Sequence, residues 1–320
     1  METFSAEFAR ALGPAGSVVA LRQRSQLHLL WWWPYACVRG WWLGRSVDVI
    51  HLGDGALAWL GVVLQWLTHK PVTVTLHGLD VTYHRYGYQR MIWPALYKLR
   101  GLVCVSPATA AIVQQHLPTK PVQVIGHGIR IDDWPLNQAV GNNRCLLFVG
   151  RLIERKGCAW FIAKVLPQLA DVHLHVVGSG PELAHCRQLV QALHLTERVR
   201  FHGQVNNQTL RQHYTAAQAL IMPNLFLAGD IEGFGLVALE ASACGLPVLA
   251  ANLEGLAAAV IDGQTGFLLE SGNAAAWIAA IERNFVQPLQ PAMIRKTVQQ
   301  HYSWPTVIKQ YRAVMFNELI

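Results

Sequence analysis

Short apolar runs rich in valine and isoleucine alternate with helix-like segments, in two consecutive series, along this chain of 320 residues. Continuous runs of this kind are typical of parallel strands that helices cover on both faces of a sheet. The first series has its runs at 17–21, 47–52, 72–77, 102–106 and 122–126, and the second at 145–150, 172–178, 199–203, 219–224 and 247–251. The pattern predicts an α/β protein with two doubly wound, Rossmann-like domains in tandem.

Helical patterns fill the intervals between these runs. They are expected at 55–67, 89–99 and 107–116 in the first series and at 156–169, 181–193, 207–217 and 234–245 in the second, with an amphipathic helix at the N-terminus. The polar stretch NQAVGNNR, residues 137–144, suits a linker, so we place the domains at 1–136 and 137–300. Ligands of such sheets bind at the carboxyl ends of strands, which predicts a site in a cleft that the two domains face.

Composition excludes several classes of protein. Hydrophobic residues make up 52% and charged residues 14%, which indicates a globular chain. The net charge of +7 suits nucleic acid, an anionic membrane or a phosphorylated substrate, but the basic residues are spread singly, which argues against nucleic acid. None of the six cysteines forms a C-x-x-C pair, and the fourteen histidines lack metal-binding spacings. We therefore predict reduced thiols, no metal and a cytoplasmic protein without a spanning helix.

Two strand ends of the second series carry features that suit a phosphate. The segment GRLIERKG, residues 150–157, brings Arg151 and Lys156 to one loop, and VVGSGPE places Gly178 and Gly180 at the next strand end. A guanidinium and an ammonium there suit a diphosphate, and backbone N–H groups in a glycine turn can meet an anion. A solvated loop and an ordinary strand–turn–helix connection are the alternative interpretations.

The segment IEGFGLVALEASACGLPVLAA, residues 231–251, places Glu232 and Glu240 eight positions apart. Eight residues are a little over two helical turns, so the two carboxylates are expected on roughly one side of the element. Gly233 and Gly235 permit a close backbone approach to a ligand, and the start of a helix offers N–H groups to an anion. The alternative is an ordinary αβ unit with two solvated glutamates.

Together these segments resemble glycosyltransferase family 4, the retaining sugar-nucleotide transferases of glycosyl transferases group 1, which have the GT-B fold. The match includes GRLIERKG, VVGSGPE, VRFHGQV, EGFGLVALEASACGLPVLA and DGQTGFLLE. In the first half it is thinner, with VTLHGLDV, VCVSPAT and VIGHGIRIDDW. YSWPTVIKQY, within residues 301–320, resembles the closing helix that crosses back to the first domain.

The resemblance implies a role for individual residues. Arg151 and Lys156 would bind the donor diphosphate and stabilise the leaving group, Glu232 would bind donor-sugar hydroxyls, and Glu240 would hold the ribose. His77 would face the donor sugar from the first domain, or else be a buried histidine that caps a strand end. Further donor contacts are expected at Gly178, Gly180, Gly203, Val205, Gly233, Phe234, Gly235 and Leu236. The family needs no metal or other cofactor, and its front-face mechanism requires no general base.

Two departures from the family stand out. Members normally begin with a strand and a glycine-rich loop, whereas this sequence begins at the helix-like ETFSAEFARALG. A start site assigned too far downstream, a natural short form and an inactive form are the three interpretations. His127 also replaces the asparagine that usually precedes Gly128.

The acceptor is indicated only by a cluster of tryptophan and arginine. Trp31, Trp32, Trp33, Trp41 and Trp42 lie near Arg39 and Arg45, which suits either a water–lipid interface or a packed, sugar-stacking core. We predict transfer of a sugar from a nucleotide-diphosphate sugar to a glycan or lipid-linked acceptor in cell-envelope polysaccharide or lipopolysaccharide synthesis, with docking at the anionic inner membrane face left open. The alternatives are a non-catalytic nucleotide-binding paralogue and a sugar-nucleotide 2-epimerase of the same fold.

Overall fold

A computed structural model describes residues 2–17, 19, 28–83, 86–137, 144–228 and 230–316. The chain divides into two compact units, Met1–Gly128 with Trp304–Ile320 and Ile129–Ser303, called here the first and the second unit. The unit boundaries thus fall a few residues away from the ones placed by composition. The run at 17–21 and the polar stretch at 137–144 lie mostly outside the described residues.

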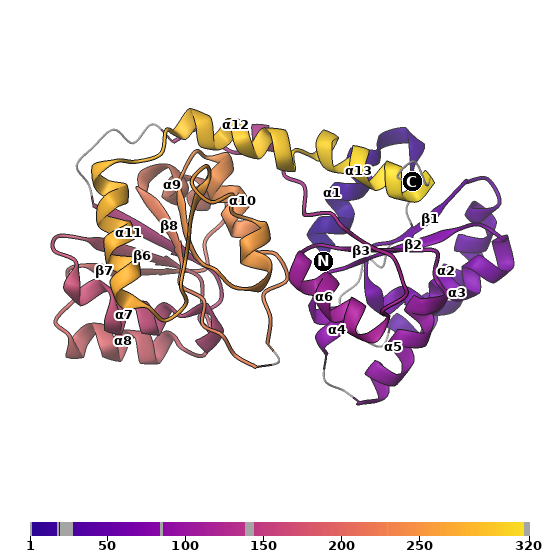
Figure 1. Ribbon diagram of the computed structural model, residues 1–320, viewed down its shortest axis with the longest axis horizontal. Coiled ribbons are helices and arrows are strands. Elements are labelled where there is room, and N and C mark those ends of the chain that lie inside the picture. The colour runs from indigo at the N-terminus through magenta and orange to yellow at the C-terminus, as the bar shows by residue number, and fades with distance from the viewer. Residues whose placement is uncertain are drawn as a thin grey trace. The chain divides into compact units, whose positions relative to one another are not determined.

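The first unit contains a parallel sheet in the order β1-β2-β3-β4 (Figure 1). Its strands are β1 (Ile50–Leu52), β2 (Val72–Leu76), β3 (Gly101–Cys104) and β4 (Val122–Val124). The helices are α1 (Glu2–Leu12), α2 (His28–Gly44), α3 (Ala58–Thr68), α4 (Leu79–Thr82), α5 (Tyr86–Lys98), α6 (Pro107–His116) and α13 (Trp304–Phe316). The segment that carries the cluster of tryptophan and arginine, for which no helix was predicted, is the long helix α2.

Both faces of this sheet are covered, because the side chains of β2 alternate between two cores. Val72, Val74 and Leu76 pack into a cluster with α3 and α5. On the other face, Thr75 lies 3.0 Å from the hydroxyl of Tyr311, in a cluster formed by α1 and α13. Figure 1 shows these two helices, from opposite ends of the chain, next to each other.

The second unit contains a parallel sheet in the order β10-β9-β8-β5-β6-β7. Its strands are β5 (Cys145–Val149), β6 (His173–Val177), β7 (Val199–Gly203), β8 (Ala219–Met222), β9 (Val248–Ala251) and β10 (Gly266–Leu269). The helices are α7 (Cys158–Lys164), α8 (Leu183–Ala192), α9 (Asn207–Ala216), α10 (Leu236–Ala243), α11 (Ala274–Val286) and α12 (Pro291–Tyr302). The prediction of two parallel α/β units is confirmed.

The strand order of the second unit reverses between β5 and β8, which are hydrogen-bonded neighbours. In an open parallel sheet, the crevice at such a reversal is where ligands bind, because the following loops diverge to opposite faces. The loops that follow β5 and β8 therefore define the place to look for a site in this unit.

Two local expectations need correction. Helix α10 begins only at Leu236, after Gly235 adopts the left-handed conformation with φ 82°. Glu232 consequently lies in the loop before the helix, so the expectation that a spacing of two helical turns sets the two carboxylates on one side of the element was wrong. The helix expected at 156–169 is also shorter, because Pro167 lacks an N–H group and the chain turns into the 3-10 helix Leu166–Gln168.

No disulfide joins the six cysteines, and all of them except Cys37 are buried. Within the described part of the chain, no helix has the length and apolar character needed to cross a bilayer.

Candidate active site

Three strand-end loops of the second unit pack against one another through glycines. A Cβ atom at Gly157 would lie 1.9 Å from the carbonyl oxygen of Pro223, in the loop after β8. At Gly178 it would lie 1.9 Å from the oxygen of Gly150, and at Gly180 it would lie 2.2 Å from that of Leu152. Because no side chain fits at these distances, glycine is required for the loops after β5, β6 and β8 to meet.

A charged cluster occupies the loops at the reversal of strand order. Arg155 donates to Glu232 over 2.6 Å and pairs with Asp230 at 3.0 Å. The ammonium of Lys156 contacts the same Glu232 oxygen, to which Asn224 also donates over 3.2 Å. The loop after β5 therefore supplies the cations, and the loop after β8 supplies the carboxylates.

Burial and charge act in opposite directions on this cluster. The side chains of Arg155, Lys156 and Glu232 are only 5%, 12% and 16% exposed. Burial raises the pKa of Glu232, but Lys156 and Arg155 outweigh it and lower that pKa to about 2. Burial lowers the pKa of Arg155, but the charge and hydrogen bond of Glu232, together with the charges of Asp230 and Glu254, outweigh burial and raise that pKa. Glu232 is thus ionised at neutral pH, held between two cations.

Arg151 and Arg155 have different positions, although both lie in the same loop. Arg151, the arginine singled out in the sequence, is exposed, and no ion pair engages it among the residues that the structure describes. Arg155, which we did not single out, is buried beneath Glu232. The signal for Arg155 was weak, since only its place beside Lys156 in a loop between an apolar strand and a helix distinguishes it.

Glu240 lies on α10, and its carboxylate accepts a hydrogen bond of 2.8 Å from the hydroxyl of Tyr214 on α9. Burial raises the pKa of Glu240, which the hydrogen bond from Tyr214 partly opposes. The burial of Tyr214 raises its own pKa well above the usual range, so this residue is a neutral donor. Tyr214 is a second residue that the sequence did not reveal.

The segment between the two glutamates forms the entry to α10. Gly255 donates its N–H to the carbonyl of Glu232 over 3.0 Å. A side chain at Gly255 would lie 2.1 Å from the oxygen of Gly233. Phe234 is buried, whereas Leu236 is exposed at the first position of the helix. The predicted donor-contact positions therefore lie at the N-terminus of α10, directly after Glu232 in the chain: Gly233, Phe234, Gly235 and Leu236.

The remaining predicted positions of this unit lie along β6 and β7. Gly178 donates its N–H to the carbonyl of Gly203 over 2.7 Å, which joins the ends of the two strands. Val205 follows in the connection between β7 and α9, and is partly buried.

In the first unit, the ring of His77 is engaged locally. Its Nε2 lies 2.9 Å from the carbonyl oxygen of Gly53, and the ring of Phe4 packs against it with centroids 4.9 Å apart. The ring of His127 also stacks on the ring of His77, with centroids 5.3 Å apart. Asp80 accepts from the backbone N–H of His77 and does not bond its ring. These contacts fit the interpretation of a strand-end histidine, and a role of His77 toward the donor stays a prediction.

Two family models match this chain over most of its length. The one described as glycosyl transferases group 1 matches residues 143–285, and the one described as glycosyltransferase family 4 matches residues 4–133. The first of these contains the whole charged cluster. This chain therefore belongs to the group 1 glycosyltransferases of family 4, and it is an enzyme of that class.

Individual relatives agree with this assignment. The phosphatidyl-myo-inositol mannosyltransferase of Propionibacterium freudenreichii is 27% identical, covering 87% of this chain and 73% of the relative. That of Mycobacterium leprae is 28% identical, covering 93% and 79%. Anabaena HepE, solved with UDP and glucose, superimposes with a TM-score of 0.73 at 19% identity, over 92% of this chain and 84% of HepE. The last comparison supports the GT-B fold alone.

Proposed function

We propose that this glycosyltransferase moves a sugar from a nucleotide-diphosphate sugar to a glycan or lipid-linked acceptor of the cell envelope, with retention of configuration and without a metal at the diphosphate. One observation carries the proposal. At the reversal of strand order, Lys156 and Arg155 converge on Glu232, while Arg151 extends from the same loop to solvent. The largely buried cations Lys156 and Arg155 and the exposed Arg151, all near the reversal of strand order, suit a diphosphate ligand.

The cluster also supports a mechanism. A donor diphosphate would compete with Glu232 for the ammonium of Lys156, and Arg151 would add a second charge from the solvent side. The carboxylate of Glu232 would then be free to accept hydrogen bonds from donor-sugar hydroxyls. As the sugar–phosphate bond breaks, the fixed cations and the N–H groups at the start of α10 would stabilise the negative charge on the leaving nucleoside diphosphate.

The names of the relatives indicate which substrates to test first. HepE is solved with UDP and glucose, and the two relatives above are named as mannosyltransferases acting on phosphatidyl-myo-inositol. These names favour a hexosyl donor and a lipid-linked acceptor that carries hydroxyls.

The decisive experiment incubates purified protein with labelled UDP-, GDP- and ADP-sugars, with and without a membrane lipid extract. We expect release of nucleoside diphosphate and labelled product only with the extract, and loss of both in Glu232→Gln. Arg151→Ala should weaken nucleotide binding, whereas Arg187→Ala, an exposed arginine on α8 of the same unit, serves as the matched control. Nucleotide binding without transfer for any donor would favour the non-catalytic paralogue, and an altered nucleotide sugar would favour the epimerase.

A surface of the first unit supports a lipid-linked acceptor. Tyr35, Val38, Trp41 and Trp42 on α2 and Trp66 on α3 are exposed apolar side chains, and these two helices pack together. Arg39 and Arg45 lie over the rings of Trp42 and Trp41, at 4.8 and 5.1 Å. Trp32 and Trp33 pack into a small core, whereas the side chain of Trp31 lies outside the described residues.

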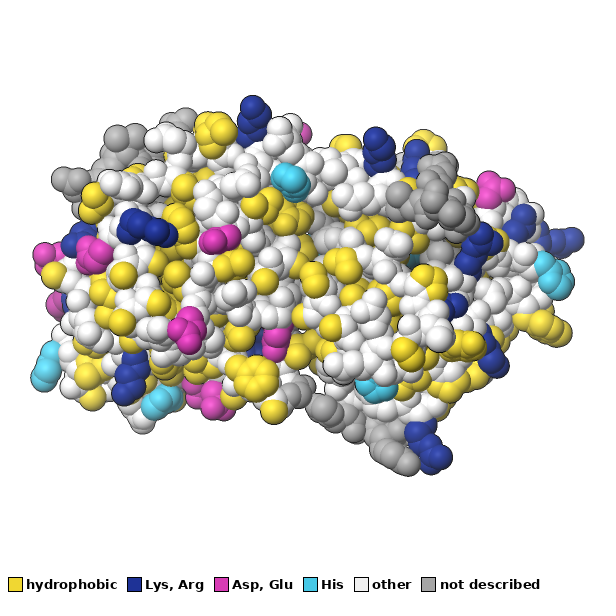
Figure 2. Space-filling model, in the orientation of Figure 1, with side chains coloured by type: hydrophobic (Ala, Val, Ile, Leu, Met, Phe, Trp, Pro, Cys, Tyr) yellow, Lys and Arg dark blue, Asp and Glu magenta, His cyan; other side chains and the backbone are white. Residues whose placement is uncertain are grey.

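This mixture of tryptophan and arginine suits the headgroup region of a membrane. On the face shown in Figure 2, Lys and Arg side chains are dispersed singly, unlike a nucleic-acid-binding stripe. We expect the protein to sediment more strongly with anionic than with neutral vesicles, with binding reduced but not abolished by salt. Trp42→Ser and Trp66→Ser together should weaken sedimentation, while Trp160→Ser, in the second unit, should not. Equal sedimentation with both vesicles would remove the electrostatic part of this proposal.

A further inference from the structure

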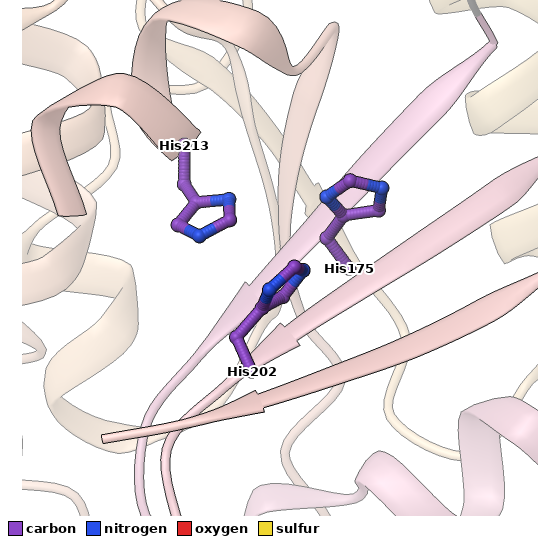
Figure 3. A group of neighbouring side chains, drawn as sticks. All are labelled: His175, His202 and His213. Carbon is purple, nitrogen blue, oxygen red and sulfur yellow. The ribbon is translucent and has the colours of Figure 1, made fainter. Parts of the chain in front are cut away.

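Three histidines of the second unit come together from three different elements. His175 lies on β6, His202 on β7 and His213 on α9. One ring nitrogen from each lies within 4.8 Å of the others. Figure 3 shows the three imidazoles facing a common space between the two strands and the helix. Such convergence is not expected from packing alone, because imidazole rings that only fill space need not direct their nitrogens at one another.

A β-bulge contributes to this arrangement. Val176 pairs with Phe201, and the next residue, Val177, pairs with Gly203, so His202 is an extra residue without a partner in the register. Bulges re-aim a side chain and are common beside functional sites. The ring of His202 lies 4.9 Å from that of His175 and 4.3 Å from that of His213.

The imidazole nitrogens are available to a ligand. In the part of the chain that the structure describes, no hydrogen bond engages the ring nitrogens of these three residues. His175 and His213 are partly buried and His202 is exposed, which leaves one side open to solvent. Burial lowers the pKa of all three, which favours the neutral imidazole that binds metals.

We propose that His175, His202 and His213 form a binding site for one divalent transition-metal ion of the zinc type, with water at the fourth position. Imidazole nitrogen is a preferred ligand of Zn²⁺, Ni²⁺ and Cu²⁺, whereas Mg²⁺ and Ca²⁺ prefer oxygen. Zinc–nitrogen bonds of about 2.0–2.1 Å in a tetrahedron place the nitrogens roughly 3.3 Å apart. Small side-chain rotations would close the present separations, and the exposed ring of His202 has the freedom to make them.

The ion would join elements that also carry the proposed donor site. His202 precedes Gly203, whose carbonyl accepts from Gly178, and His213 precedes Tyr214, which bonds Glu240. Ligation would therefore fix β6, β7 and α9 relative to one another and stabilise the second unit. The three imidazoles form a neutral ligand set, and among the groups that act electrostatically on His175, Arg200 is a cation whose charge opposes metal binding. The site is separate from the diphosphate cluster, for which we propose no metal.

The test uses full-length protein without a polyhistidine tag, stripped with chelator and titrated with ZnCl₂ by calorimetry. We expect one equivalent of Zn²⁺, a higher unfolding temperature with Zn²⁺, and no response to Mg²⁺. Co²⁺ should produce the visible d–d bands of a tetrahedral nitrogen site. His202→Ala and His175→Ala should weaken binding by roughly tenfold or more, while His185→Ala, an exposed histidine on α8, should leave it unchanged.

The outcomes are independent of sugar transfer, so failure of the proposed function would not affect them. Because His202 is exposed, its replacement is expected to leave the fold intact, and circular dichroism checks this. Absence of a one-equivalent isotherm in the wild type would overturn the proposal. So would Zn²⁺ binding that His202→Ala and His185→Ala weaken equally, since the ion would then be bound by scattered surface histidines.

Discussion

In each unit a largely buried carboxylate lies near the carboxyl end of the parallel sheet, Asp80 after β2 and Glu232 after β8, but the two are held by different partners. Asp80 is buried and accepts from the backbone N–H groups of His77 and Gly55. Glu232 lies between the side chains of Lys156 and Arg155. Peptide dipoles hold the first carboxylate, and full positive charges hold the second.

Because of this difference, the pKa values of the two carboxylates shift in opposite directions, although burial raises both. Burial and the nearby charge of Asp54 together raise the pKa of Asp80 to about 7, against backbone hydrogen bonds that lower it. The pKa of Glu232 is lowered to about 2, because the two cations outweigh burial. The two carboxylates therefore differ in their surroundings. Asp80 orders the turn whose N–H groups it accepts from, whereas Glu232 neutralises two cations that an anionic ligand could bind in its place.

The largest expected effect is on the stability of the second unit. Arg155→Met removes a buried guanidinium and leaves Glu232 and Asp230 without it, which should cost about 3 kcal/mol of unfolding free energy. Arg151→Met changes an exposed arginine in the same loop and should cost less than about 0.5 kcal/mol while still weakening nucleotide binding. Urea unfolding, with hydrogen exchange to assign the loss to the second unit, measures both. Equal costs for the two variants would contradict the distinction between them.

Next in size is the pH dependence carried by Asp80. Its folded pKa of about 7 lies above the ordinary value of 3.8, so its contribution to stability is complete at low pH and is lost as pH rises through 7. Relative to wild type, Asp80→Asn should therefore gain roughly 2–3 kcal/mol between pH 5 and pH 7. The difference between the two proteins is the quantity to measure, because His77 and other buried histidines titrate nearby with the opposite sign. A difference that does not vary with pH would show that Asp80 titrates normally.

The architecture was predictable from the sequence because its signal is local and repeated. Buried strands such as β2 and β5 read as continuous runs of apolar and β-branched residues, and a parallel sheet follows from the helices between them. The position of Lys156 and Glu232 at strand ends followed from the same pattern. The Trp-rich helix α2 was not predicted, since a segment that is apolar on most sides has no clear period.

The details of the site were less predictable because they depend on backbone geometry at a few residues. Whether Arg151 or Arg155 turns inward is set by the 3-10 turn Glu154–Lys156 and by Gly157 at φ 69°, neither of which the charge pattern encodes. Helix α10 was expected to begin at 234, and the left-handed Gly235 that delays its start to Leu236 was not anticipated, so helical spacing was wrongly used to relate Glu232 to Glu240. The three histidines are far apart in the sequence, and the bulge at His202 that helps to gather them is a feature of strand register.

A smaller effect should come from Glu232 on the acid side. Its folded pKa of about 2 lies below the ordinary value of 4.5, so its contribution to stability is present above pH 4.5 and is lost as pH falls toward 2. Wild type should lose roughly 2 kcal/mol relative to Glu232→Gln between pH 5 and pH 3. Urea unfolding at each pH tests this, and Glu270→Gln, an exposed glutamate of the same unit, is the control. Parallel curves for wild type and Glu232→Gln would mean that the cations do not set this pKa.

The smallest effect concerns Glu240, whose carboxylate accepts a hydrogen bond from the neutral hydroxyl of Tyr214. Its partner is thus a side chain, as for Glu232, but an uncharged one, as for Asp80. Tyr214→Phe removes the donor of that 2.8 Å hydrogen bond and keeps the buried ring, so it should lower the free energy of unfolding by about 1 kcal/mol. If Glu240 holds the ribose, the loss should appear in the affinity for nucleoside diphosphate, as a decrease of roughly fivefold by calorimetry. In a Glu240→Ala background the same substitution should have almost no further effect, because the hydroxyl then has no carboxylate to orient. Additive losses in this cycle would show that Tyr214 acts on the nucleotide site by a route that does not pass through Glu240.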